Sequence, residues 1–146
     1  MTRVTSLEKI DTAQIYKGWC NYFEKVGIKF PEVVTAQMVH ETNFCTSKIL
    51  RENNNMFGMK LNKRGFCSGE LNGHAYYKSV ALSIMDYREY QRMMLRLADV
   101  QKRTPHTNDE YMKLLEDLPH LRGARYAEDK NYIPSLRKRI DILKSM

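Results

Sequence analysis

The stretch GMKLNKRGFCSGELNGHAYYKS, residues 58–79, decides the fold class because its composition differs from that of the chain on either side. It contains four of the seven glycines and the pair Asn72-Gly73. Asn-Gly is a strong signal for the type I′ turn of a β-hairpin. The flanking segments instead repeat apolar residues at the helical period. The sequence therefore predicts a mainly α fold with a small β-hairpin lobe at about residues 57–79, and a cleft between the two parts.

Helical spacing outside this lobe gives the other elements. A first helix with an amphipathic stripe should stop at Gly27, and a second should begin at Pro31 and run to about Glu41. Later helices are expected from near Ser79, from an N-cap at Asn108, and after Asn131, where Pro134 falls early in the helix. The apolar residues that define the stripes of the first, third and last helices are Ile15, Trp19, Tyr22, Val26, Tyr87, Tyr90, Met94, Leu97, Ile133, Leu136, Ile140 and Leu143.

Size and composition set the class of protein. The chain has 146 residues, 42% hydrophobic and 28% charged, so we expect one monomeric domain over residues 1–146. It has no run of about 18 apolar residues, and no membrane span is expected. The opening MTRVTSLEKIDTAQ has no signal-peptide pattern. We therefore expect a protein that is made in the cytoplasm and needs another route to act outside it.

The net charge of +7 favours an anionic partner, which could be nucleic acid, a membrane surface or an acidic cell-wall polymer. The charge is widely spread, and a solvated surface is the simpler explanation. The three cysteines are Cys20, Cys45 and Cys67. Their odd number and their spacing predict neither a complete disulfide framework nor a zinc knuckle, but buried or half-buried free thiols.

Glu41 is the first candidate for chemistry. A zinc motif H-E-x-x-H fails here, because its second histidine position is Phe44. Glu41 shares a helical face with Val34, Met38 and Cys45. Apolar neighbours and the negative end of a helix both shift the pKa of a carboxyl group upward, as a general acid requires. The alternative is a Glu that reaches into water, which is the more common case for a lone Glu on a helix.

Three further residues are candidates. Glu70, in SGELNG on the hairpin, lies on a different element from Glu41, as expected for two carboxyl groups that flank a substrate. An exposed strand residue is an equally good interpretation. Tyr126 and Tyr132 flank Asp129 in RYAEDKNY, where capping and packing before the last helix would also explain them.

Four motifs extend these observations: AQMVHETNF, NNMFGMK, YYKSVALSIMDY and RYAEDKNY, at residues 36–44, 54–60, 76–87 and 125–132. In this order they resemble the motifs of the bacterial and phage N-acetylglucosaminidases of glycoside hydrolase family 73. The resemblance covers about residues 12–144. It implies a lysozyme-like α+β fold and an endo-β-N-acetylglucosaminidase that cleaves the β-1,4 bond after N-acetylglucosamine in peptidoglycan. It also implies glycan strands as partners, no nucleic acid, no metal and no cofactor.

The resemblance assigns roles to individual residues. Glu41 falls on the family's general acid, and Phe44 falls on the aromatic residue that follows it. Asn55, Phe57 and Gly58 fall on the N-N-L-F-G-I-K segment, which shapes the floor of the sugar cleft.

The remaining roles fall on the hairpin and on the last motif. Tyr126 falls on the tyrosine of Y-A-T-D that is implicated in catalysis. Tyr132 falls on the second tyrosine, which we expect at the substrate site in a more structural role. Glu70 is the carboxylate nearest to the family's second, hairpin-borne acid.

Three positions depart from the family pattern. Arg125 replaces the glycine before Y-A-T-D, Lys130 replaces the proline after its Asp, and Phe44 stands where Trp is usual. These changes bear on substrate preference more than on the reaction.

Two alternative functions stay open. A lytic transglycosylase of lysozyme-like fold needs only one acid, although the N-N-(L/M)-F-G motif favours hydrolysis. A basic protein that binds cell wall or nucleic acid without catalysis has weak support from the RKR patch at residues 137–139. The opening of the chain fits a bacteriolytic phage endolysin that leaves through a holin-type pore, cargo of a dedicated secretion machine, or a domain of a longer chain.

Overall fold

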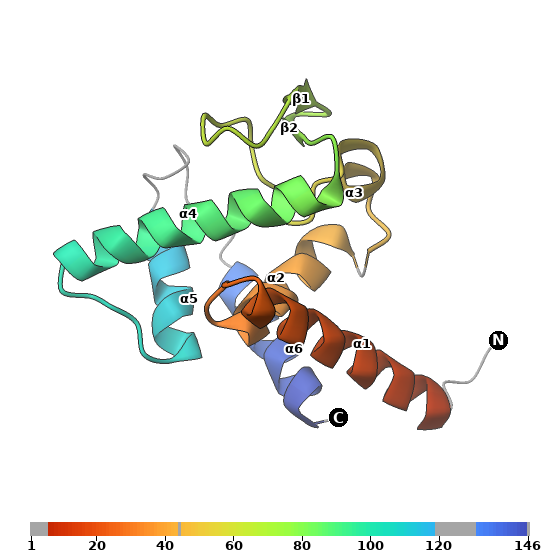
Figure 1. Cartoon of the computed structure of the whole chain (residues 1–146). Helices are drawn as coiled ribbons and strands as arrows, with labels where there is room; N and C mark the ends of the chain where they lie inside the picture. Colours follow the sequence, from red (N-terminus) through yellow and green to blue (C-terminus); the bar gives the residue numbers. More distant parts are fainter. Residues whose placement is uncertain (1–5, 44, 119–130, 146) are drawn as a thin grey trace.

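The computed structural model describes residues 6–43, 45–118 and 131–145 and is mainly helical with one small sheet (Figure 1). The prediction of a mainly α, lysozyme-like α+β fold is confirmed. In chain order the elements are α1 (Ser6–Lys25), α2 (Pro31–Thr42), α3 (Lys48–Asn53), β1 (Gly69–Leu71), β2 (His74–Tyr76), α4 (Val80–Val100), α5 (Asn108–Asp117) and α6 (Tyr132–Ser145).

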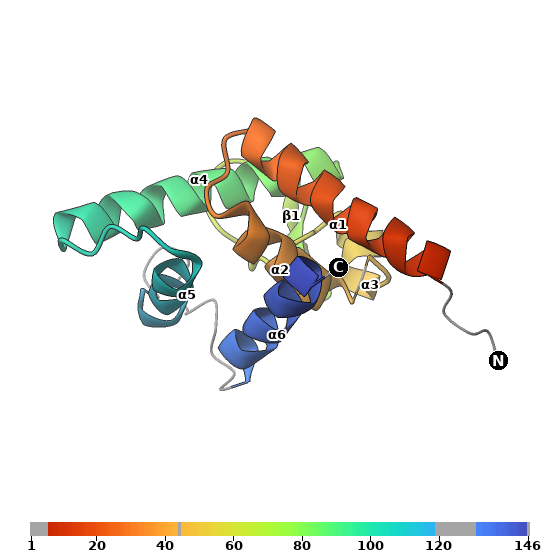
Figure 2. The same ribbon diagram turned by 90° about the horizontal axis from the view of Figure 1, so that it is seen from below.

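Helix α2 is the central element of the helical part (Figure 2). It packs against α1, α3, α5 and α6. Eight of its 12 residues are buried, as expected for a helix that is covered on most sides. Its observed range confirms the predicted helix from Pro31 to about Glu41. Glu41 therefore lies near the C-terminal end of a helix that is covered on most sides.

Helix α4 connects the two parts of the protein. In Figure 1 the hairpin and α3 lie near its first turns, and α5 lies near its last turns. Ser79 caps it, as its Oγ accepts a backbone N–H of the first turn at 3.3 Å. The cap of α5 lies one residue earlier than predicted. Thr107 accepts the N–H of Glu110 at 3.1 Å, whereas Asn108 is the first helical residue and its side chain donates to Glu32.

The predicted hairpin is confirmed. Strands β1 and β2 are antiparallel, with Leu71 opposite His74. The turn residues Asn72 and Gly73 have φ values of 57° and 74°. Both values lie in the left-handed region that a type I′ turn requires, which explains the Asn-Gly pair.

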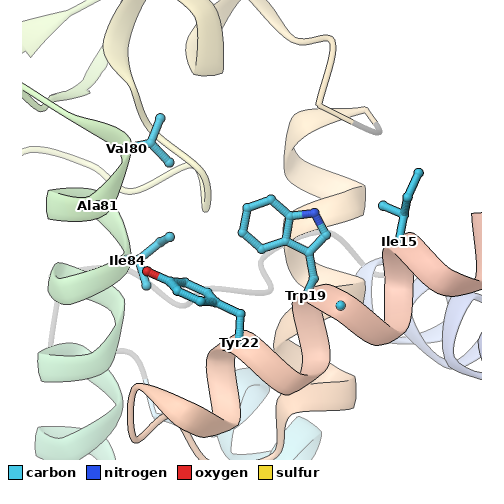
Figure 3. A pocket seen from close by; sticks show the side chains of 7 residues that line it. Ile15, Trp19, Tyr22, Val80, Ala81 and Ile84 are labelled. Atoms are coloured by element: carbon cyan, nitrogen blue, oxygen red, sulfur yellow. The ribbon is translucent and has the colours of Figure 1, made fainter.

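Helix α1 confirms the predicted helix but corrects the direction of its apolar stripe. Gly27, with φ at 90°, follows its last turn as predicted. Ile15 and Tyr22, however, are 52% and 41% exposed, whereas Tyr16 and Phe23 are buried. The buried face is therefore shifted by one residue, which is about 100° around the helix axis. Three residues of the predicted stripe, Ile15, Trp19 and Tyr22, line a surface pocket instead (Figure 3). Neither α1 nor any other helix of the described residues is long and apolar enough to span a membrane.

A chain of hydrogen bonds between side chains crosses the core beside α2. Gln91 Nε2 donates to Tyr111 Oη at 2.9 Å, and the hydroxyls of Tyr111 and Tyr87 are 2.7 Å apart. Tyr87 donates to Gln37 Oε1, whose Nε2 donates to Tyr132 Oη at 3.2 Å. Because the single proton of Tyr87 goes to Gln37, Tyr111 must donate to Tyr87. The chain fixes α2 to α4, α5 and α6.

Tyr111→Phe should lower the free energy of unfolding by about 1–3 kcal/mol, because it removes the middle of this buried chain while keeping the ring. The side chain of Tyr111 is fully buried, so water cannot replace the lost hydroxyl. Urea unfolding followed by circular dichroism measures the change. Tyr22→Phe is the matched control, since that residue is 41% exposed and should change little. Equal effects of the two substitutions would contradict a structural role for the chain.

Candidate functional site

Glu41 is half-buried in the last turn of α2. The chain turns sharply after it, because Asn43 adopts left-handed backbone angles. Thr42 closes this end of the helix: its Oγ1 donates to the carbonyl of Met38 at 2.6 Å and accepts the N–H of Cys45 at 2.9 Å. The backbone that carries the Glu41 carboxylate is therefore held on both sides.

Gln37 lies one turn before Glu41 and is fully buried between Tyr87 and Tyr132. The ring of Tyr132 also meets His40 edge to face, with centroids 5.1 Å apart. Tyr132 is only 4% exposed. The structure thus places it as a support of the helix that carries Glu41, and its predicted place at the substrate site stays a prediction.

Gly58 lies directly against the carboxylate of Glu41. A Cβ atom built at Gly58 would stand 2.5 Å from Glu41 Oε2 and 3.0 Å from its Cδ. Gly58 also has a φ of 64°, a conformation that favours glycine. The structure therefore brings two of the predicted site residues together, and a larger residue at position 58 would force the Glu41 carboxylate to move.

Three consecutive asparagines hold the loop that ends at Gly58. Asn53 Nδ2 donates to the carbonyl of Leu71 at 2.6 Å, and Asn54 Nδ2 donates to that of Tyr77 at 2.8 Å. Asn55 Nδ2 donates to Ala75 O at 3.0 Å, and its Oδ1 accepts the N–H of residue 59 at 3.1 Å. Asparagine suits this task because its amide both donates and accepts. The loop is fastened to the hairpin lobe.

The predicted residues Asn55 and Phe57 are buried, at 1% and 0% exposure. Phe57 packs against Phe23 and Tyr87, with ring centroids 5.8 and 4.4 Å away. Direct contact of these two side chains with a sugar does not fit this burial. Their predicted part in the floor of a sugar cleft stays a prediction, and Gly58 is the member of the segment that lies against Glu41.

Glu70 lies on the exposed side of the hairpin, opposite Ala75 in the sheet. The N–H of Ala75 in turn donates to the carbonyl of Met59 at 2.9 Å, next to Gly58. Two inter-strand spacings therefore separate the backbone of Glu70 from the loop that carries Gly58, a distance of about 10 Å. Its role as a second acid stays a prediction.

Phe44 and Tyr126 lie outside the described residues. Their predicted roles as an aromatic neighbour of Glu41 and as a catalytic tyrosine stay predictions.

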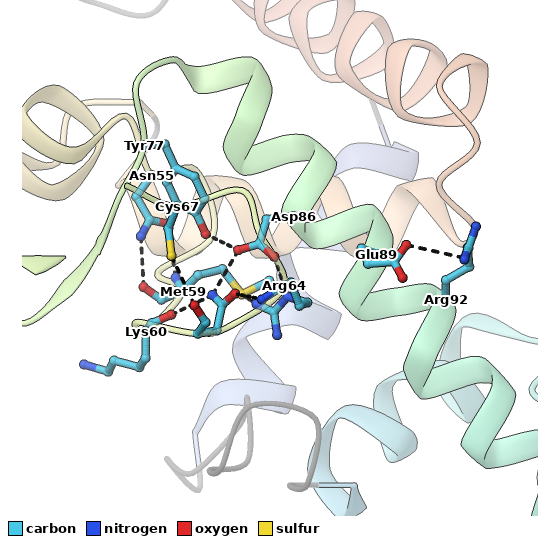
Figure 4. Close-up of polar contacts among 10 residues, drawn as sticks. Asn55, Met59, Lys60, Arg64, Cys67, Tyr77, Asp86, Glu89 and Arg92 are labelled. Atoms are coloured by element: carbon cyan, nitrogen blue, oxygen red, sulfur yellow. Dashed lines mark hydrogen bonds and ion pairs between the residues drawn. The ribbon is translucent and has the colours of Figure 1, made fainter. Parts of the chain in front are cut away.

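A buried polar cluster around one carboxylate joins the hairpin lobe to α4 (Figure 4). Its centre is Asp86, whose side chain is fully buried. Arg64 Nε and the hydroxyl of Tyr77 donate to it, and Asn62 Nδ2 donates at 3.0 Å. Burial and the negative charge of Asp86 raise the pKa of Tyr77, so its hydroxyl stays a donor. The sequence analysis missed Asp86, although a carboxylate on the buried face of a helix is a signal that could have identified it; two of its partners, Asn62 and Arg64, come from a distant loop.

The described residues contain no group of three or more His, Cys, Asp or Glu side chains placed to hold a metal ion. All three cysteines are free as predicted, but Cys45 is exposed rather than buried. Its left-handed backbone, with φ at 66°, follows the sharp turn after α2 and directs it outward.

The chain matches the glucosaminidase family, described as mannosyl-glycoprotein endo-beta-N-acetylglucosaminidase, over residues 18–145. This match includes every element described above except the start of α1. It also includes all of the residues predicted for the site.

A curated relative is Protein bax of Escherichia coli (strain K12), which is 36% identical over 72 residues. The alignment covers 47% of this chain and 26% of that protein, so the chain matches about a quarter of the relative's length. No solved structure matches the chain.

Proposed function

Since the chain belongs to the glucosaminidase family, a family of glycoside hydrolases, we propose that it hydrolyses the β-1,4 bond after N-acetylglucosamine in peptidoglycan, with Glu41 as the general acid. Glycosidases of most families need an acid that protonates the oxygen of the leaving sugar. The net charge of +7 suits an anionic cell-wall polymer. We further propose that the protein reaches the wall through lysis or a dedicated secretion route.

The contact between Glu41 and Gly58 carries this proposal. A general acid must be held at one position relative to the bond that breaks. Here the residue is half-buried, its helix is fixed through Gln37, and a Cβ atom built at Gly58 would stand only 2.5 Å from Glu41 Oε2. A Glu that merely reaches into water from a helix end would need none of these supports.

Digestion of purified peptidoglycan tests the reaction. Mass spectrometry of the products should show a new reducing N-acetylglucosamine end with one added water. Products without added water would indicate a lytic transglycosylase instead. Binding to the polymer without any new end would indicate the non-catalytic alternative.

Glu70→Gln tests the second acid and the mechanism. If Glu70 activates water, turnover should fall by about 10²–10⁴-fold and the product should be inverted. If the N-acetyl group of the substrate assists, the loss should be clearly smaller and the configuration should be retained. The measurement is the anomeric form of the first product by proton NMR, together with the rate. Full activity would remove Glu70 from the site.

A further inference from the structure

The third sequence motif, residues 76–87, contains neither the proposed acid nor the glycine beside it. Two of its polar residues, Ser83 and Asp86, lie three positions apart on the buried face of α4, and both are fully buried. Ser83 Oγ accepts the backbone N–H of Met56 at 3.3 Å. Helix α4 therefore holds the chain two residues before Gly58.

Asp86 holds the chain on the other side of Gly58. Its Oδ2 accepts Asn62 Nδ2 at 3.0 Å, and Arg64 Nε donates to its Oδ1. Asn62 also fixes the loop internally, since its Nδ2 donates to the carbonyl of Lys60 at 2.9 Å and its Oδ1 accepts the N–H of Arg64 at 3.0 Å. In Figure 4, Asp86 faces this loop from α4. The loop is thus bound to one helix both before and after Gly58.

The buried pair of Asp86 and Arg64 calls for more than a role in stability. The two side chains are 0% and 5% exposed. Removing such charges from water costs about as much as their attraction returns, so a buried pair is weak evidence of stabilisation. The charge-assisted hydrogen bonds from Arg64, Asn62 and Tyr77 do, however, fix the positions of their donors. Because both charged side chains are buried, an effect on the reaction must pass through the loop.

We propose that Asp86 is a positioning residue, which holds the loop at residues 56–64 against the carboxylate of Glu41. The inference rests on the proposed function, in which Glu41 is the acid. A fixed loop limits the space open to this carboxylate, since a Cβ atom built at Gly58 would already stand 2.5 Å from its Oε2. A displaced loop would let the carboxylate leave its productive position, and the rate falls steeply with such a displacement.

Asp86→Asn should lower kcat on solubilised peptidoglycan by about 10–10²-fold and change KM by less than about threefold, because the group that moves acts in the transition state. Asparagine keeps the shape of the side chain but lacks the charge that holds Arg64. The unpaired buried charge should lower the melting temperature by on the order of 10 °C. Asn62→Ala keeps the pair of Asp86 and Arg64, so it should fold normally and still lower kcat by about tenfold.

Two further variants separate position from stability. Arg64→Met added to Asp86→Asn removes the unpaired charge and should restore much of the melting temperature. The kcat should stay low, because the loop is still not bound to α4. Thr107→Ala removes the cap of α5, which lies near the last turns of α4, and should lower the melting temperature without changing kcat. A kcat that simply follows the melting temperature across these variants would contradict the proposal.

Hydrogen exchange tests the loop without the reaction. The N–H of Met59 donates to Asn55 Oδ1 at 3.1 Å. In Asp86→Asn and Asn62→Ala it should exchange at least about tenfold faster, because local opening of the loop becomes easier. The reference is the N–H of Ile28, which donates to a carbonyl of the helical part and reports any general loss of stability. Unchanged exchange at Met59 relative to this reference would overturn the proposal, as would faster exchange with a normal kcat.

Glu41→Gln separates this inference from the proposed function. A normal rate in Glu41→Gln would refute the acid and the inference together. A slow Glu41→Gln variant beside a normal Asp86→Asn variant would refute the inference alone. Loss of kcat in both, with faster exchange at Met59 only in Asp86→Asn, is the expected result.

Discussion

Glu41→Gln should reduce hydrolysis of peptidoglycan by at least about 10²-fold and up to about 10⁴-fold, the range that general acid catalysis contributes. Glutamine keeps the size and hydrogen-bonding capacity of the side chain but carries no proton that it can transfer to the leaving sugar. The backbone supports at Thr42 and Gln37 do not involve the Glu41 carboxylate, so the fold should persist. Loss of turbidity gives the rate, and thermal unfolding gives the stability.

Two controls separate chemistry from folding. Glu52→Gln changes an exposed carboxylate on α3 and should leave the rate as it is. Binding of the Glu41→Gln variant to insoluble peptidoglycan should remain, because only the proton donor is lost. A variant with near-normal rate and an unchanged melting temperature would assign the acid to another residue.

The elements that follow from local chemistry could be predicted from the sequence. The Asn72-Gly73 turn needs two left-handed residues, Ser79 caps the helix that it precedes, and Pro31 opens α2. Helix α3 was missed, because its six residues are too few to show a helical period. The buried face of α1 was also assigned wrongly, since apolar residues occupy two adjacent faces of that helix and only packing decides between them.

The candidate site shows the same difference between local features, which the sequence can indicate, and long-range contacts, which it cannot. Glu41 was singled out by the resemblance of its motif, because its spacing alone favoured a Glu that reaches into water. The hydrogen bonds and ion pairs that support the site could not be predicted, because they join residues far apart in the chain. Asn53 reaches Leu71 across 18 positions, and Arg64 reaches Asp86 across 22. A single sequence contains no signal that pairs such residues.

Gly58→Ala should lower the rate of hydrolysis by about 10²-fold, although the substituted residue carries no functional group. The new methyl group would stand 2.5 Å from Glu41 Oε2, about 1 Å closer than a normal contact, so the carboxylate has to move. A displacement of about 1 Å in a catalytic group costs a rate factor of this order. The left-handed backbone adds a destabilisation of about 1–2 kcal/mol in the free energy of unfolding.

Gly73→Ala isolates the steric part of this effect. Gly73 has a φ of 74°, close to the 64° of Gly58, but no atom lies within 4 Å of the position of its Cβ. Both variants should therefore lose similar backbone stability, and only Gly58→Ala should lose the rate. Adding Glu41→Ala should restore part of the stability of Gly58→Ala and none of that of Gly73→Ala, because it removes the atoms that clash. Equal rates in the two glycine variants would mean that the loop does not position Glu41, and the contact would then be one of packing alone.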